Sequence, residues 1–368
     1  MTVNELHLNN YRNYNNAAAQ FIDGVNVITG SNAQGKTNLI EAIFYLTAGR
    51  SFRFASDKEL IKFDNDTACI RAGIVSNERE QTLEARIFHG RRREFYANEV
   101  KLKKAAELAG RLTAVMFSPD DLTLIKDGAA VRRKMMDNCL SQLRPGYLAA
   151  LTEFNKLYEH KTRILRDYHE KPALLDLLDD FNLRLAEQSA KLIYYRAAFI
   201  ESISKRAANI HDEFTDGNEA LTIYYKTVGR MDPGGKKPSE ILPEILEHQH
   251  EHRNAELKSK LCLTGAHKDD LEISINGSSA RKYASQGQAR TASVSLKLAE
   301  RDIHYNDKNE YPLLLLDDVL SELDSKRQSF ILSRIKNGQV FITCCEDTAV
   351  TAFHSGNTLR IEQGSILQ

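Results

Sequence analysis

The sequence predicts an α/β fold in which both ends of the chain form one head, with a mixed sheet and helices, and the middle forms an inserted helical arm. Three features lead to this prediction. A glycine-rich loop at residues 30–37 lies between a β-branched run and an amphipathic segment. An apolar segment at residues 313–318 ends in two aspartates near the other end of the chain. Between them, the pattern from about residue 146 onward indicates helices for a long stretch.

The N-terminal part predicts strands followed by a helix. Leu6 and Leu8 alternate with polar residues, which is typical of a strand with one buried face. Apolar and β-branched runs predict three further strands, at residues 25–29, 70–75 and 83–88. Residues 38–48 follow the glycine-rich loop and carry apolar side chains at helical spacing. Pro119 then interrupts the pattern, and we expect residues 122–139 to be helical.

The middle of the chain predicts two long helices. The first carries an apolar stripe from Leu148 to Leu165 and is interrupted by Pro172. The second carries apolar residues at near-heptad spacing from Leu174 to Ile210. At 1.5 Å per residue, an unbroken helix of this length would reach ~60 Å. We expect the two helices to form an antiparallel arm.

Shorter elements complete the predicted organisation. Strands are expected at residues 221–228, 271–275, 313–316 and 340–343, and helices at residues 239–261 and 285–304. Together these elements predict three parts: an N-terminal head part at residues 1–125, an inserted and mainly helical arm domain at residues 126–261, and a C-terminal head part at residues 262–368.

Residues 30–37 have the glycine, lysine and threonine spacing of a loop that binds nucleotide phosphates. Gly30 and Gly35 let the backbone wrap closely around phosphates, which the following helix N-terminus also favours. We expect Lys36 to neutralise the β- and γ-phosphates of ATP, and Thr37 and Asp317 to bind Mg²⁺. The residues expected to contact ATP are Gly30, Ser31, Asn32, Ala33, Gln34, Gly35, Lys36 and Thr37.

Residues 285–288 read Ser-Gln-Gly-Gln and precede a predicted helix. Taken alone, they are better explained as a polar helix cap. In order and spacing with the phosphate loop and the acidic strand end, they resemble the ATP-binding-cassette (ABC) heads of the SMC-like group of P-loop ATPases. In that group a signature Ser-x-Gly-Gln completes the nucleotide site of a second subunit. The resemblance implies that Ser285, Gly287 and Gln288 contact ATP bound to another copy of the chain.

Two positions depart from the pattern of the related heads. Asp318 stands where most of them carry the glutamate that polarises the attacking water, and Thr343 with Cys344 stands where they carry a switch histidine. We expect Asp318 and Lys36 to be the catalytic residues, with a second carboxylate near Mg²⁺ as the alternative role of Asp318. Both departures predict slow hydrolysis of ATP.

Further blocks along the whole chain resemble the RecF family. They are residues 6–14, 30–37, 49–53, 117–122, 265–271, 285–288 and 313–324. The insertion is too short for the long coiled coils of SMC proteins, which fits this compact family. Within the family's Gly-Pro-His-Arg-Asp-Asp block, this chain has Ala266 for proline and Lys268 for arginine. The lysine keeps the charge but lacks the bidentate geometry of arginine.

The resemblance to the RecF family implies a bacterial cytoplasmic protein that binds ATP and Mg²⁺, forms an ATP-dependent homodimer and binds DNA, both single-stranded and gapped or junction duplex. It implies a weak ATPase that DNA stimulates. It also implies a role in recombinational repair, replication recovery and the SOS response, through loading of the RecA recombinase at single-strand gaps. RecR and RecO are the further partners that it implies.

Basic runs at residues 91–93, 101–104 and 132–134 are the candidate contacts to DNA phosphates. Each run is equally consistent with an ordinary solvated surface. Arg50 and Arg53 follow the phosphate-loop helix closely enough in sequence to contact either nucleotide or DNA.

Other polar residues leave alternatives open. Arg12 is a candidate for stacking on adenine. His248 and His252 share a helix face, but the glutamates beside them favour a solvated helix over a metal site. His267 lies in the block that resembles the RecF family, and a structural hydrogen bond is slightly favoured over a direct functional role for it.

The composition limits the possible functions. The 368 residues include 50 basic and 50 acidic residues, so any contact with DNA must come from a local patch. No apolar run approaches the ~20 residues that span a bilayer. The scattered cysteines, five in number, fit a reducing compartment, and we expect a cytoplasmic location.

Three other functions are compatible with parts of the sequence. An SMC-like DNA clamp unrelated to gap repair would share every nucleotide-site motif. A P-loop phosphotransferase would use the insertion as a lid, but residues 285–288 would then have no purpose. A subunit that energises a membrane transporter would need a short helical subdomain in place of the long arm.

Overall fold

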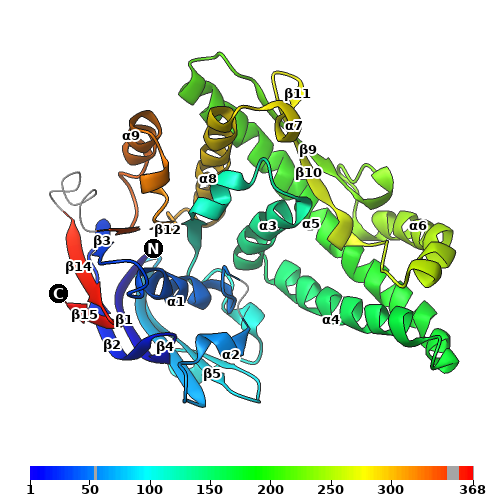
Figure 1. Ribbon diagram of the computed structural model, residues 1–368, viewed down its shortest axis with the longest axis horizontal. Helices are drawn as coiled ribbons and strands as arrows, with labels where there is room; N and C mark the ends of the chain where they lie inside the picture. The colour runs from blue at the N-terminus through cyan, green and yellow to red at the C-terminus, as the bar shows by residue number, and fades with distance from the viewer. Residues whose placement is uncertain (54–55, 346–355, 368) are drawn as a thin grey trace. The chain divides into compact units, whose positions relative to one another are not determined.

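The computed structural model describes residues 1–53, 56–345 and 356–367 (Figure 1). The chain divides into two compact units. The first combines Met1–Thr123 with Arg290–Gln368, so both chain ends contribute to it. The second is Leu124–Ala289 and continues past residue 261, where the sequence placed the end of the inserted domain.

The first unit contains an antiparallel six-stranded sheet in the order β2-β1-β4-β5-β6-β7. Its strands are β1 (Thr2–Tyr11), β2 (Tyr14–Gln20), β4 (Thr67–Ser76), β5 (Arg79–Phe88), β6 (Glu94–Ala97) and β7 (Val100–Lys101). Leu6, Leu8 and Ile70 are buried on one face, whereas His7 and Arg71 are exposed on the other. This alternation is the period-two pattern that predicted strands here.

A second six-stranded sheet in the same unit has the order β15-β14-β3-β13-β12-β8. Its strands are β3 (Val25–Thr29), β8 (Ala114–Phe117), β12 (Leu313–Asp317), β13 (Val340–Cys344), β14 (Asn357–Glu362) and β15 (Ser365–Leu367). All neighbours pair in parallel except β14 and β15. Every residue of β8, β12 and β13 is buried, which explains their continuous apolar runs.

Helix α1 (Lys36–Ala48) packs against strands of both sheets. It is buried along nearly its whole length, and Figure 1 shows it beside the strands that the two chain ends contribute. The helix predicted at residues 38–48 is therefore confirmed. The other helices with residues in this unit are α2 (Asp57–Leu60), α9 (Ser325–Arg334) and α8 (Gln286–Lys308), whose first residues belong to the second unit.

The second unit is mainly helical. Its helices are α3 (Ala129–Leu143), α4 (Pro145–Asp167), α5 (Leu178–Thr215), α6 (Pro238–Ser259) and α7 (Ala280–Tyr283). Helices α4 and α5 run antiparallel, since Tyr147 bonds to Arg196 near one end and Glu153 pairs with Arg184 further along. The unit also contains a small sheet in the order β11-β10-β9, formed by β9 (Leu221–Lys226), β10 (Asp270–Ile275) and β11 (Ser278–Ser279).

The prediction of a helix over residues 122–139 was wrong in its first part, because α3 begins only at Ala129. Pro119–Thr123 forms a 3₁₀ turn instead. The Asp121 carboxylate accepts bonds from the backbone N–H of Ser118 at 2.8 Å and from its hydroxyl at 3.1 Å. Such local bonds stabilise a turn in place of a regular helix.

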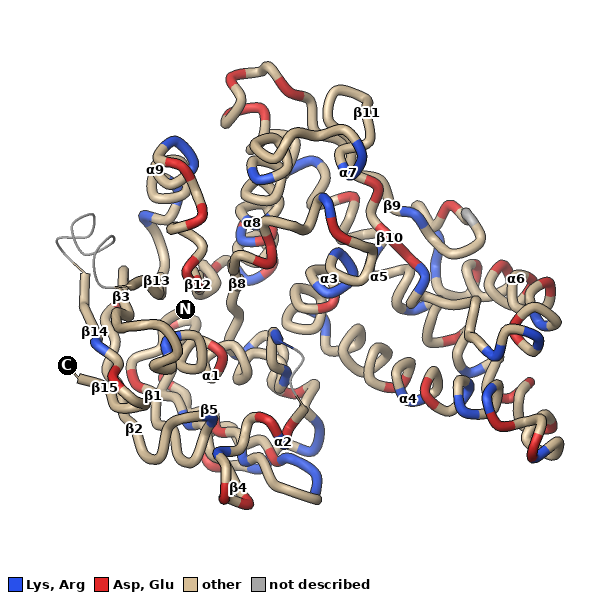
Figure 2. Tube along the Cα trace, viewed as in Figure 1, with Lys and Arg blue, Asp and Glu red and all other residues tan. Residues whose placement is uncertain are grey.

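Within the described part of the chain, no helix combines the length and the apolar character that crossing a membrane would require. Basic and acidic residues are interspersed along the backbone of both units, as Figure 2 shows.

Candidate nucleotide site

The glycine-rich loop connects β3 to α1, which is the strand, loop and helix context that a phosphate loop requires. Gly30 has φ 143° and Gly35 has φ 120°, both outside the range that side chains favour. A Cβ atom at Gly30 would collide with the carbonyl oxygen of Ile361, and one at Gly35 would lie 2.6 Å from Nδ2 of Asn13. Only glycine fits at these two positions.

Segments from both ends of the chain hold the loop in place. The Asn13 amide donates to the carbonyl of Gln34 at 2.7 Å, and the Tyr14 hydroxyl donates to the carbonyl of Gly35 at 3.0 Å. Near the C-terminus, the N–H of Gly364 donates to the Gln34 carbonyl at 3.2 Å. These bonds all end on oxygens of the loop and use none of its N–H groups. These bonds therefore leave the N–H groups of the loop available to bind phosphate oxygens.

Lys36 is buried at the start of α1. Its ammonium group donates to the carbonyls of Gly30 at 2.5 Å and Ser31 at 3.1 Å, and it lies 3.7 Å from Sγ of Cys345. The Cys345 thiol in turn donates to the side chain of Asn32. A buried cation whose partners are neutral carbonyls is poised to exchange them for phosphate oxygens, which bind it more strongly.

Thr37 and Asp317, the expected Mg²⁺ ligands, lie together. The Thr37 hydroxyl donates to Oδ1 of Asp317 at 2.9 Å. Burial raises the pKa of Asp317 above its ordinary value, against the opposing effect of hydrogen bonds from Thr343 and Thr37. A buried carboxylate beside a threonine hydroxyl is a donor set that suits Mg²⁺.

Thr343 joins the two aspartates that follow the apolar strand. Its hydroxyl donates to Oδ1 of Asp317 at 2.8 Å and accepts the backbone N–H of Asp318 at 2.9 Å. Asp318 itself has φ 53°, and Ser321 donates to its carbonyl at 2.7 Å. The sequence pattern showed only that Thr343 replaces a switch histidine. It did not predict the bonds of Thr343 to the two aspartates.

A buried carboxylate that the sequence analysis also missed lies on α1. Glu41 accepts two bonds of 2.9 Å from Arg12 and one of 2.5 Å from Ser51. Arg12, the candidate for adenine stacking, thus has its guanidinium held by Glu41. Arg53 donates to Asn38 at 3.2 Å and lies 4.0 Å from Glu41, so it too belongs to this cluster. The signal that would have found Glu41 is a charged residue between the apolar side chains of Leu39, Ile40, Ala42 and Ile43.

Residues 285–288 form a helix cap in the second unit, and their contact with ATP of another copy stays a prediction. The Ser285 hydroxyl accepts the N–H of Gln288 at 3.1 Å, and the Gln288 side chain accepts the N–H of Ser285 at 2.9 Å, which together make a capping box. The Gln288 amide also donates to Glu219 at 3.0 Å, and Glu219 pairs with His211 at 3.1 Å. These bonds fix the start of α8.

The block at residues 265–271 organises the second unit. Asp269 is buried and accepts bonds from Arg196 at 2.9 Å and Tyr225 at 2.7 Å, while Asp270 binds Arg132 through two bonds of 2.7 and 2.9 Å. His267 bonds to the carbonyl of Cys262 at 3.1 Å, and burial lowers the pKa of its imidazole to about 4. These contacts support the structural role for His267.

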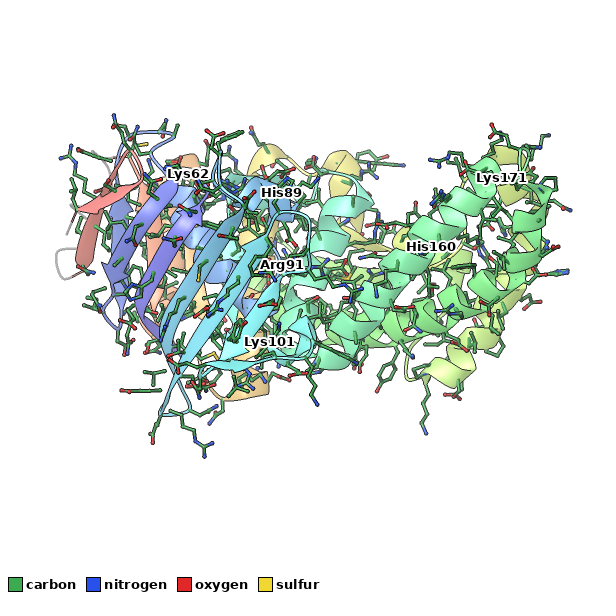
Figure 3. The ribbon with its side chains drawn as sticks, turned by 90° about the horizontal axis from the view of Figure 1, so that it is seen from below. Lys62, His89, Arg91, Lys101, His160 and Lys171 are labelled. Carbon is green, nitrogen blue, oxygen red and sulfur yellow. The ribbon has the colours of Figure 1, made fainter. Side chains whose placement is uncertain are left out.

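The basic runs differ in how exposed and how paired they are. Arg132 is buried on Asp270, and Arg93 pairs with Asp57 at 2.8 Å, so neither is an ordinary solvated cation. Arg91 stacks on Phe88, and Lys101 pairs with Glu94 at 2.5 Å. Figure 3 shows Arg91 and Lys101 on one side of the first unit, together with Lys62 and His89.

The His248 and His252 rings are tilted by 31° to each other, with centroids 4.1 Å apart. Nδ1 of His252 contacts the His248 carbonyl at 2.9 Å. Among the described residues, no cluster of potential metal ligands contains either histidine. Both side chains are half-buried on α6, and the solvated-helix interpretation stays a prediction.

Comparison with known proteins bears out the predicted family and fold. The family model of the RecF/RecN/SMC N-terminal domain matches residues 2–366. The DNA replication and repair protein RecF of Acetivibrio thermocellus is 38% identical over 99% of both chains. The solved structure of the recombination mediator protein RecF-ATP in the RecFOR pathway superposes with a TM-score of 0.88 at 34% identity, covering 99% of this chain and 96% of that one.

An SMC head domain from Pyrococcus furiosus has the same fold, with a TM-score of 0.53 at 14% identity over 99% of this chain and 94% of its own. The ABC-type P-loop ATPase head predicted from the sequence is thereby confirmed. The match extends over nearly the whole length of each RecF relative. The chain therefore belongs to the RecF family of DNA replication and repair proteins.

Proposed function

We propose that this protein is an ATP-gated DNA clamp of recombinational repair, in which two copies close on DNA when they bind ATP and part after slow hydrolysis. The observation that carries the proposal is the link from Thr37 through Asp317 and Thr343 to Asp318. It joins the phosphate loop to the end of the acidic strand in a single hydrogen-bonded arrangement. A relative of known structure is the recombination mediator protein RecF-ATP. It supports ATP as the nucleotide that this chain binds.

The residues of the loop have distinct roles in this proposal. Gly30, Ser31, Asn32, Ala33, Gln34 and Gly35 would surround the phosphates with backbone N–H groups. Lys36 would turn from its carbonyl partners to the β- and γ-phosphates. Thr37 and Asp317 would hold Mg²⁺, which supplies charge neutralisation when bound.

Asp318 would orient and deprotonate the attacking water. Its position is fixed at the backbone by Thr343, and its side chain is one methylene shorter than the glutamate of most related heads. Since reach and orientation decide the efficiency of a general base, this geometry favours slow turnover. A weak ATPase suits a protein that uses ATP as a timer.

Ser285, Gly287 and Gln288 would contact the γ-phosphate held by a second copy of the chain. The position of Ser285 just before the N-terminus of α8 supports this role, because a helix N-terminus favours negative charge. The homodimer would then contain two ATP sites, each with residues from both copies.

For DNA, we propose a local patch on the first unit that includes Lys62, His89 and Arg91 (Figure 3). Such contacts to phosphates would give affinity with little sequence preference. A solved relative is a recombination mediator of the RecFOR pathway, which supports a role of this chain in the same pathway. We further propose that the protein acts at single-stranded gaps in the cytoplasm, with RecR, RecO and RecA as partners.

Sedimentation velocity tests the ATP gate. The wild type should sediment as a monomer without nucleotide and as a dimer with a non-hydrolysable ATP analogue. Ser285→Arg should bind the analogue normally but remain monomeric, because the arginine would obstruct the site of the other copy. A wild type that stays monomeric with saturating analogue would contradict the proposal.

A further inference from the structure

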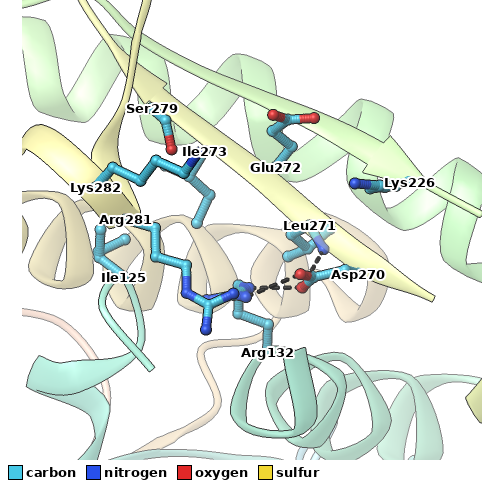
Figure 4. Close-up of a pocket in the computed structure, with 10 residues that line it drawn as sticks. All are labelled: Ile125, Arg132, Lys226, Asp270, Leu271, Glu272, Ile273, Ser279, Arg281 and Lys282. Carbon is cyan, nitrogen blue, oxygen red and sulfur yellow. Dashed lines mark hydrogen bonds and ion pairs between the residues drawn. The ribbon is translucent and has the colours of Figure 1, made fainter. Parts of the chain in front are cut away.

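We propose that a basic pocket in the second unit binds a phosphate group of the DNA backbone. The pocket lies against β10, α7 and the end of β9, and its volume is about 230 Å³ (Figure 4). None of its residues belongs to the nucleotide site described above. The inference deepens the proposed DNA clamp and rests on it, because it assigns one place where the clamp would hold its DNA.

The floor of the pocket is an internal ion pair. Arg132 reaches up from α3 and donates two hydrogen bonds to the carboxylate of Asp270, as the dashed lines in Figure 4 show. Its remaining nitrogen, Nη1, donates to the carbonyls of Leu124 at 2.9 Å and Asp127 at 2.8 Å. Arg132 and Asp270 therefore neutralise each other and form a rigid surface with no net charge.

The rim of the pocket carries an excess of positive charge. Lys226 ends β9, and Arg281 and Lys282 lie on α7, all of them exposed. Over the residues that the structure describes, none of these three side chains has an ion pair or a side-chain hydrogen bond. Glu272 is the one further acidic residue among those that line the pocket. Three free cations against one carboxylate leave the rim attractive to an anion.

The chemistry of the rim favours phosphate over a carboxylate ligand or a metal. Arginine and lysine donors that outnumber the one free carboxylate, Glu272, suit an oxyanion, and the guanidinium of Arg281 offers a fork that can bind two phosphate oxygens at once. The cavity volume of about 230 Å³ far exceeds the ~15 Å³ that a single water needs, which leaves room for one phosphate group with its hydration.

The pocket also lies close in sequence to the predicted signature. Only Tyr283 and Ala284 separate Lys282 from Ser285. The Ala284 carbonyl accepts a bond from Lys126, and the ring of Tyr283 is 74% exposed beside the pocket-lining residues. A phosphate held by α7 would therefore be bound next to the start of α8, the segment that is proposed to meet ATP of the second copy.

The salt dependence of DNA binding tests the proposal. For duplex DNA, the slope of log Kobs against log salt falls by ~0.9 for each phosphate contact that is removed. We expect the double variant Arg281→Gln with Lys282→Gln, measured by fluorescence anisotropy with ATP analogue, to bind more weakly and to have a slope smaller by about 1 to 2. Lys226→Gln alone should reduce the slope by at most about 1.

A matched control removes two exposed cations from elsewhere in the same unit, Lys171→Gln with Lys258→Gln. This variant should keep the slope of the wild type. An unchanged slope in the Arg281 and Lys282 double variant would overturn the pocket assignment, provided that thermal melting shows the variant to be folded. A wild type that binds no DNA at all would instead overturn the proposed clamp.

A second arm separates DNA phosphate from free phosphate. Inorganic phosphate is titrated against the wild type and the double variant at constant ionic strength, with chloride as the reference anion. DNA binding should weaken more in phosphate than in chloride for the wild type, and equally in both for the double variant. Tight binding of inorganic phosphate with no change in the DNA slope would contradict the assignment to a nucleic-acid backbone.

Discussion

Single residues decide how the acidic strand end is presented to the nucleotide. The Thr343 hydroxyl bridges the Asp317 carboxylate and the backbone N–H of Asp318, and it is buried in the parallel sheet. A buried N–H group that loses its hydrogen-bond partner destabilises the folded protein by the full free energy of its desolvation. A threonine at this position thus does more than replace an absent histidine.

The bridge is tested by Thr343→Val, which keeps the shape of the side chain and removes the hydroxyl. We expect the free energy of unfolding to fall by about 1–3 kcal/mol, because the Asp318 N–H and the Asp317 carboxylate lose a partner. Urea unfolding measures the change. Thr343→Ser keeps the hydroxyl and should lose clearly less stability; equal losses in both variants would contradict the bridge.

His267 gives the fold a specific sensitivity to acid. Its pKa is lowered, chiefly by burial, to about 4 in the folded protein, against an ordinary value of 6.5. The unfolded chain therefore binds more protons between these values, and stability is lost as the pH falls from 6.5 towards 4. The contribution of one histidine is at most about 1.4 kcal/mol per pH unit.

The change that tests this is His267→Gln, which retains a side chain able to bond to the Cys262 carbonyl. Denaturant unfolding between pH 7 and pH 4 should show a shallower loss of stability in this variant than in the wild type. The exposed His250→Gln variant should follow the wild type. Parallel curves for His267→Gln and wild type would rule out a buried neutral imidazole.

At the scale of elements, buried ion pairs join helices that are far apart in sequence. Lys161 on α4 contacts Glu256 on α6 at 2.7 Å, and both side chains are almost completely buried. Glu256 also accepts bonds from the backbone N–H groups of Leu263 and Thr264, which follow the end of α6. One carboxylate thereby fixes two helices and the segment that leads to β10.

Removing that carboxylate should be costly. We expect Glu256→Ala to lower the free energy of unfolding by about 3–5 kcal/mol, because Lys161 would remain buried without its partner. Glu201→Ala removes a carboxylate from an exposed pair with Lys205 on α5 and should cost no more than about 0.5 kcal/mol. Chemical denaturation compares the two, and similar costs would contradict the importance of the buried pair.

Elements with regular patterns were predictable from the sequence. Local spacing of apolar residues is enough to indicate which side chains are buried. It predicted the strands β3, β12 and β13 from their apolar runs, and the helices α1 and α5 from their periodicity. The start of α3 was missed, because a carboxylate at Asp121 stabilises a turn where propensity alone would extend the helix. A sequence pattern indicates which residues are buried, but it does not show where a side chain bonds to the backbone and prevents a helix.

The candidate site was predictable to the same degree. The phosphate loop, Thr37 and Asp317 follow from motif spacing, and the structure brings Thr37 and Asp317 within hydrogen-bond distance. The contacts of Glu41 with Arg12, and of Thr343 with both aspartates, join positions that no local pattern relates. The extension of the second unit to Ala289 has the same origin, since β10 pairs with β9 from before α6.

For the whole molecule, we propose that one chain carries two halves of different ATP sites. The phosphate loop and Asp317 belong to the first unit, whereas Ser285 belongs to the second. A complete site would then need the phosphate loop of one copy and the signature of another. ATP turnover should be lost when every copy lacks the phosphate loop, or when every copy lacks the signature. It should persist when one copy of the dimer lacks only the loop and the other lacks only the signature.

Mixing two inactive variants tests whether the two copies share their ATP sites. Lys36→Ala lacks a working phosphate loop and Ser285→Arg lacks a working signature, so each alone should show no DNA-dependent ATP hydrolysis above background. An equimolar mixture should regain hydrolysis, because the loop of the Ser285→Arg copy and the signature of the Lys36→Ala copy form one intact site in each mixed dimer. A mixture as inactive as its folded components, or full activity in Ser285→Arg alone, would contradict sites shared between two copies.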